Sequence, residues 1–89
     1  MNGTEKQIAF ANDIIKEWRN HAATKKAFYE SKGPNEAGMK LLEKASEVLE
    51  ERIAACEKAS EIISSRYSKD FDYENIFITL MRGFTTRLF

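Results

Sequence analysis

The sequence predicts an all-α protein in which three amphipathic helices pack as a bundle. Apolar side chains recur at helical intervals over most of the 89 residues, the pattern of helices that bury one face. Proline and glycine are rare, and Gly33-Pro34 is the only clear break in the middle of the chain. Because a chain of this length forms one domain at most, we expect residues 1–89 to share a single core.

The first helix is predicted over residues 5–31. Thr4 is followed three residues later by Gln7, the spacing of a capping box. One apolar stripe follows, with Phe10 and Phe28 on its border: Ile8, Ala11, Ile15, Trp18, Ala22 and Tyr29. Lys25 falls inside this stripe, so either the helix frays near residues 21–26 or Lys25 lays its stem on the core and directs its ammonium group outward. We favour a helix that continues through this weak spot.

The second helix is predicted over residues 35–67, with Asn35 as its N-cap. Its apolar stripe has members seven residues apart, with Ile53 beside them: Leu42, Leu49, Cys56 and Ile63. At 1.5 Å per residue this helix would be roughly 50 Å long, which is long for a chain of this size.

The third helix is predicted over residues 72–88, with Asp72 as its N-cap. Its apolar residues share one face: Tyr73, Phe77, Leu80, Met81, Phe84 and Leu88. Residues 75–81 are also rich in the β-branched and aromatic residues typical of strands. A lone strand would have no partner elsewhere in the sequence, so the helix is preferred.

The unequal lengths of these helices predict self-association. The middle helix extends beyond what the third can cover, and large uncovered apolar areas usually mark interfaces. We therefore expect a homodimer or higher homo-oligomer, with another protein as a further candidate partner. The expected interface residues are Trp18, Leu42, Leu49, Arg52, Ile53, Ile63, Phe84 and Phe89. Arg52 lies within the apolar stripe, where it either fixes the register of the interface or, as we favour, extends past small alanines to solvent.

The sequence contains no pattern that indicates an enzyme, a cofactor or a metal site. His21 is the only histidine, and helical spacing places no nucleophile beside it. Cys56 lies in an apolar stripe, where a cysteine behaves as a small hydrophobe. Glu43 and Glu47 are four residues apart, but the Glu-x-x-His pairs of di-metal bundles are missing. We expect a non-enzymatic protein that has no catalytic, cofactor-binding or metal-binding residues.

Composition indicates the cytoplasm and weighs against membranes and bulk nucleic-acid binding. The 14 basic and 14 acidic side chains cancel, whereas proteins that neutralise phosphates usually carry a basic excess. A single cysteine excludes an intrachain disulfide. The opening MNGTEKQIAF lacks the basic and apolar segments of a signal peptide, and no apolar run approaches the roughly 20 residues of a membrane span.

Residues 3–11, Gly-Thr-Glu-Lys-Gln-Ile-Ala-Phe-Ala, resemble the start of short, functionally uncharacterised proteins of bacteria, phages and mobile elements. Those proteins open with Gly-Thr-x-Lys-Gln-Ile-x-x-Ala. The resemblance covers about a tenth of the chain; it implies a microbial origin and a helical start, and it transfers no functional residue.

Two functions remain open at this point. The leading hypothesis is a self-associating helical module for protein–protein interaction. The alternative is a nucleic-acid-associated accessory factor of a phage or mobile element, which would use Lys16, Arg19, Lys25 and Lys26. These cations scatter around the first helix, so a single chain presents no basic stripe, although an oligomer would multiply their charge.

Overall fold

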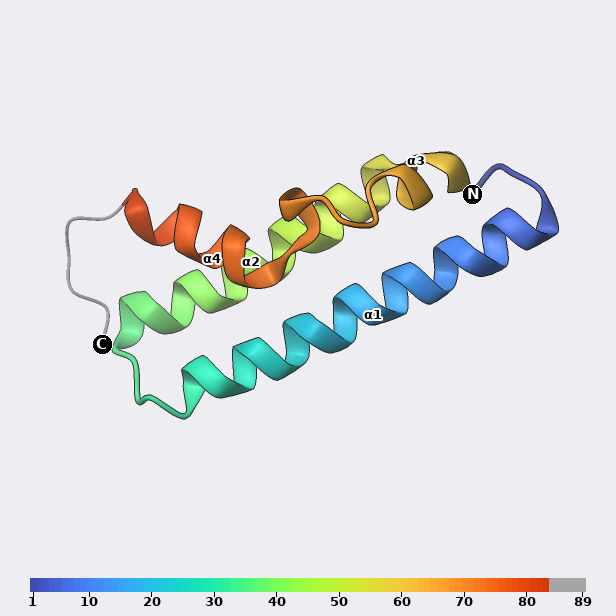
Figure 1. Cartoon of the computed structure of the whole chain (residues 1–89). Coiled ribbons are helices and arrows are strands. Elements are labelled where there is room, and N and C mark those ends of the chain that lie inside the picture. The colour runs from blue at the N-terminus through green and yellow to red at the C-terminus, as the bar shows by residue number, and fades with distance from the viewer. Residues whose placement is uncertain (84–89) are drawn as a thin grey trace.

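The fold is all-α, and the computed structural model describes residues 1–83. Helix α1 (Glu5–Glu30) runs along the whole molecule, and α2 (Glu36–Ala55) and the short α3 (Ala59–Ser64) return beside it (Figure 1). The 3-10 helix η1 (Lys69–Phe71) and α4 (Tyr73–Arg82) then reverse direction again, so that α4 lies against α2. The molecule is elongated, with extents of 46 × 22 × 17 Å.

The helix starts predicted from the sequence are confirmed by their capping groups. The Thr4 side chain accepts a hydrogen bond from the Gln7 amide, and the Gln7 side chain accepts one from the Thr4 amide, both at 3.1 Å. The Asn35 side chain caps α2 through the Gly38 amide, and Asp72 caps α4. These side chains satisfy amides that have no partner inside a helix.

Helix α1 is continuous through residues 21–26, as favoured above. Lys25 is half-buried, and its ammonium nitrogen lies 2.9 Å from Glu74 Oε2 at the start of α4. The hydrogen bond with Glu74 is the main cause of a raised pKa of Lys25, which keeps this group charged. The helix therefore tolerates a lysine beside its apolar stripe by pairing it at the edge of the core.

The predicted second helix over residues 35–67 is wrong beyond Ala55, because the chain leaves the helix at residues 56–58. Cys56 and Lys58 adopt extended conformations there. Asn2 lies beside the break, where its amide donates to the Glu57 carbonyl (2.9 Å) and its carbonyl accepts from the Ala59 amide (2.7 Å). Asn2 thus forms hydrogen bonds with backbone groups that would have bonded within the helix if the helix had continued.

The lengths of the helices explain why the break is favourable. A helix over residues 35–67 would outrun α1, which spans roughly 39 Å at 1.5 Å per residue, by about 10 Å. Ending α2 at Ala55 instead lets α3 pack against the first turns of α1, where Ala59 and Ile62 are fully buried. The excess length that predicted an uncovered apolar surface is therefore removed within one chain.

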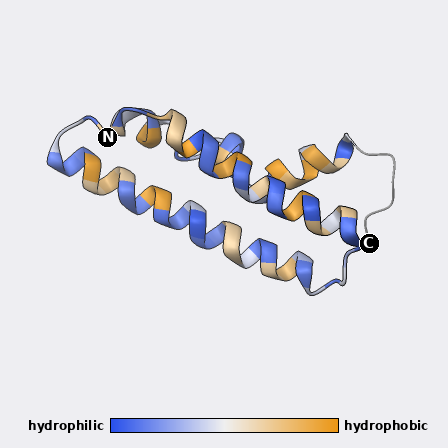
Figure 2. Ribbon diagram, turned by 180° about the vertical axis from the view of Figure 1, so that it is seen from behind, coloured by the Kyte–Doolittle hydropathy of each residue, from blue (hydrophilic) through white to orange (hydrophobic). Residues whose placement is uncertain are grey.

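The core forms where α2 and α4 pack on each other and on α1, and it continues to where α3 packs against α1. Hydrophobic residues dominate α4 and alternate with polar ones on α1 (Figure 2). Tyr73 is fully buried, and its hydroxyl donates to the Leu42 carbonyl at 2.7 Å. The largest fully buried side chains are Tyr73, Phe77, Ile14, Leu42, Leu49 and Ile62. The predicted third helix is confirmed from Tyr73 to Arg82, but Gly83 is its C-cap and no longer helical. Residues 84–88 of the predicted range lie outside the described part of the chain.

Candidate interaction surface

Four of the eight residues expected at an interface are buried in the core of a single chain. Trp18, Leu42, Leu49 and Ile53 are each at most 9% exposed. Ile63 is half-buried, while Phe84 and Phe89 lie outside the described residues. The apolar stripes that predicted self-association thus serve first as the core of one chain.

Arg52 is half-buried at the edge of that core. Its guanidinium Nη1 donates to the backbone carbonyl of Asp70 at 2.5 Å. The side chain therefore joins α2 to the turn of η1 and satisfies a carbonyl there. In this chain Arg52 fixes an intramolecular contact.

The cations of the nucleic-acid alternative are mostly paired with carboxylates. Arg19 forms a two-pronged pair with Glu50, at 3.0 Å from Nε and 2.8 Å from Nη2. Lys26 Nζ lies 2.7 Å from a Glu43 oxygen, and Lys25 pairs with Glu74 as described. Three of the four cations are therefore locally neutralised. Lys16 is exposed.

The described residues expose four large apolar side chains: Met1, Phe10, Phe28 and Tyr67. Two of them lie close together near the first turns of α1. Phe10 on α1 is 39% exposed, and Tyr67, which follows α3, is 86% exposed. The Arg66 guanidinium lies over both rings, with its carbon 5.1 Å from each ring centre. This cation–π arrangement holds two exposed aromatic rings in place. We call Phe10, Arg66 and Tyr67 the Phe10 face.

An open hollow of about 370 Å³ adjoins the Phe10 face and shares Arg66 and Tyr67 with it. Trp18 and Phe71 also line it, and their rings stack with centroids 4.3 Å apart and planes 11° apart. This stacking fixes η1 against α1, so the hollow has a rigid aromatic side. His21 and Asp72 form part of its polar edge.

His21 lies beside a carboxylate that helical spacing could not reveal. Its Nε2 is 3.2 Å from Asp72 Oδ1, and both side chains are about half exposed. Asp72 also caps α4 by accepting from the Glu74 amide at 3.0 Å. Both groups are accessible to solvent. Within residues 1–83, however, no hydroxyl or thiol is hydrogen-bonded to the other ring nitrogen, so no activated nucleophile is assembled.

The surroundings of Cys56 and Glu43, the other titratable groups considered from the sequence, indicate structural roles. Cys56 is half-buried, and burial is the main cause of its raised pKa, so thiolate formation is disfavoured. Glu43 is engaged by Lys26. No three ligand-type side chains of residues 1–83 converge as a metal ion would require. None of the helices described has both the length and the apolar content of a membrane span.

The Phe10 face was not recognised as a site from the sequence. Phe10 borders the stripe of α1, and its exposure follows from polar neighbours on the same face. The approach of Arg66 and Tyr67 depends on the break after α2, which no local pattern announces. In comparisons with known proteins, no family model, curated protein or solved structure matches this chain.

Proposed function

We propose that this protein is a non-enzymatic helical module that binds another polypeptide through the Phe10 face and the adjoining hollow. The observation that carries the proposal is the Arg66 guanidinium held between the exposed rings of Phe10 and Tyr67. We place the module in the cytoplasm of a bacterium or a phage-infected cell, which the resemblance of residues 3–11 and the single cysteine support.

The chemistry of this surface supports a protein partner. Tryptophan, tyrosine and arginine are the residues in which interface binding energy concentrates, and all three occur here. The cation–π contacts position the rings of Phe10 and Tyr67 before binding, which lowers the conformational entropy lost on association. A ring that is 86% exposed, as Tyr67 is, also gains considerable buried area when a partner covers it.

The other two functions receive less support from the geometry. Nucleic-acid binding would first have to displace the carboxylates that pair with Arg19, Lys25 and Lys26. An enzyme centred on His21 and Asp72 would need a nucleophile and a site that excludes water, whereas this pair is half exposed. A protein-binding surface needs neither.

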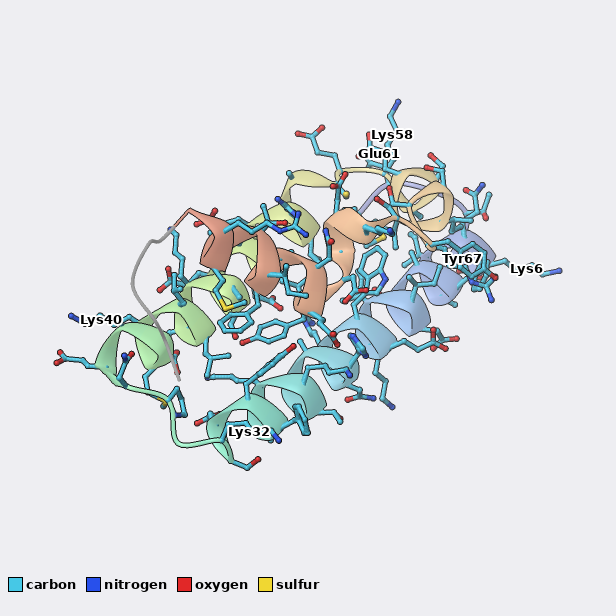
Figure 3. All side chains as sticks on the ribbon, turned by 60° about the vertical axis from the view of Figure 1, so that its left-hand side comes forward. Lys6, Lys32, Lys40, Lys58, Glu61 and Tyr67 are labelled. Atoms are coloured by element: carbon cyan, nitrogen blue, oxygen red, sulfur yellow. The ribbon has the colours of Figure 1, made fainter. Side chains whose placement is uncertain are left out.

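The test is site-specific photo-crosslinking in extract of the native host. A photoreactive phenylalanine analogue replaces Tyr67 in one protein and Lys40 in the control, because Lys40 lies at the opposite end of the molecule (Figure 3). We expect adducts of discrete mass from position 67 only, and their loss when Arg66→Glu is added. The absence of adducts, or equal adducts from both positions, would overturn the proposal.

A further inference from the structure

One exposed face of α1 carries opposite charges on the two sides of Phe10. Lys6 lies one turn before Phe10 and Asp13 one turn after it, and seven residues bring Lys6 and Asp13 onto the same side of the helix. Both are exposed, and among residues 1–83 neither forms an ion pair. The face therefore runs from a free cation, past an aromatic ring, to a free anion.

This order of charges is complementary to itself when one copy is turned by 180°. In an antiparallel pair of α1 helices with a two-fold axis midway between residues 6 and 13, Lys6 of each copy lies opposite Asp13 of the other. The axis then passes beside Phe10, so the two Phe10 rings meet at the centre. A parallel arrangement would instead place like charges together, which is unfavourable.

We propose that the polypeptide bound by the Phe10 face is a second copy of this chain, paired through antiparallel α1 helices. This inference rests on the proposed function and names its partner. The Phe10 rings supply the apolar centre, and two Lys6–Asp13 pairs fix the direction. Tyr67 flanks the centre; Figure 3 shows it at the same end of the molecule as Lys6.

The proposed contact involves only the first turns of α1 at one end of a molecule whose long axis is 46 Å. We therefore expect it to bury less than the roughly 800 Å² per partner of standard stable complexes, which makes the dimer weak and its population dependent on concentration. Sedimentation velocity from about 1 μM to about 1 mM covers the range of weak association. We expect the sedimentation coefficient to rise over this range from that of a monomer to that of a dimer.

Charge-reversed variants test the arrangement directly. Lys6→Glu and Asp13→Lys should each weaken self-association by about tenfold or more, because every two-fold dimer contains the altered pair twice. An equimolar mixture of the two variants should regain association, since the carboxylate introduced at position 6 of one chain then faces the ammonium group introduced at position 13 of the other. Lys40→Glu, the same change at the opposite end, should leave association unchanged.

Thermal melting of the variants distinguishes loss of folding from loss of association. An acidic residue in the first turn of α1 favours the helix, so Lys6→Glu should melt no lower than the parent protein. Phe10→Ala removes the apolar centre without altering charge, and it should also produce a monomer. A monomer at about 1 mM, or no recovery in the mixture, would overturn the dimer.

Crosslinking from position 67 distinguishes failure of the dimer proposal from failure of the proposed function. Adducts of twice the chain mass support the dimer. Adducts only to other proteins, from a protein that sediments as a monomer, would overturn the second copy as partner and retain the interaction module. No adducts from a monomeric protein would overturn both.

Discussion

The stacking of Phe71 on Trp18 should make Phe71 one of the most costly aromatic rings to remove. Phe71 is 8% exposed and lies 4.3 Å from the Trp18 ring centre, whereas Phe28 on the same molecule is 52% exposed. Deleting a buried phenylalanine costs about 3–5 kcal/mol. Because Phe71 borders an open hollow that can relax, we expect Phe71→Ala to cost about 3 kcal/mol.

Phe28→Ala is the matched control, since it makes the same chemical change on the surface. It should cost less than about 1 kcal/mol, mostly from the lost contacts with Tyr29 and Lys32. Against a total stability of about 5–13 kcal/mol for a chain of this length, the two losses are easily separated. A loss of about 3 kcal/mol should lower the melting temperature by about 15 °C.

Urea unfolding followed by the fluorescence of Trp18, the single tryptophan, measures both losses. The Phe71→Ala midpoint should fall by about 1.5 M if the urea dependence is about 2 kcal/mol per molar. The native emission should also change, because the ring that covers Trp18 is gone. Equal losses for the two variants, or a loss below about 1 kcal/mol for Phe71→Ala, would refute the packing of η1 on α1.

Further predictions concern Tyr73, Gly3 and Leu49. Tyr73→Phe should cost about 1–2 kcal/mol in thermal unfolding by removing the hydroxyl that donates to the Leu42 carbonyl. Burial raises the pKa of Tyr73, so the folded state holds this proton more tightly and loses stability as pH rises above about 10. Tyr73→Phe should lessen that alkaline loss, and an unchanged slope would contradict the assignment. Gly3→Ala should cost more than Gly33→Ala in the same assay: both glycines have positive φ, but only at Gly3 would the new Cβ meet neighbours at 3.1 Å. Leu49→Lys should abolish cooperative melting, because it strands a charge at a position that is 2% exposed; an unchanged melting curve would disprove the register of α2.

Local sequence signals predicted correctly where the helices begin. They did not predict where α2 ends, because that end depends on a contact with a residue far away in the sequence. Thr4, Asn35 and Asp72 are caps whose hydrogen-bonding partners lie within three residues, so the sequence alone reveals them. The end of α2 at Ala55 carries no proline or glycine. It depends on Asn2, whose position near residue 58 exists only after the chain has folded.

The candidate site was predictable only in part for the same reason. A seven-residue apolar pattern predicts that Leu42 and Leu49 are buried, but it does not say whether the same chain or another covers them. Tyr73, in the same chain, bonds to the Leu42 carbonyl. The Phe10 face requires Arg66 to reach α1 from the far side of the break, and its exposed rings carry no periodic signal.

The bridge between Asn2 and Lys58 bears on the order in which segments of the chain fold. It joins segments separated by more than half of the polypeptide, so we expect it to close late, after α2 has formed and turned back. Until then the Ala59 amide lacks its acceptor, the Asn2 carbonyl. Hydrogen exchange at that amide should therefore report when the first residues dock, and it should slow later than exchange in the middle of α1.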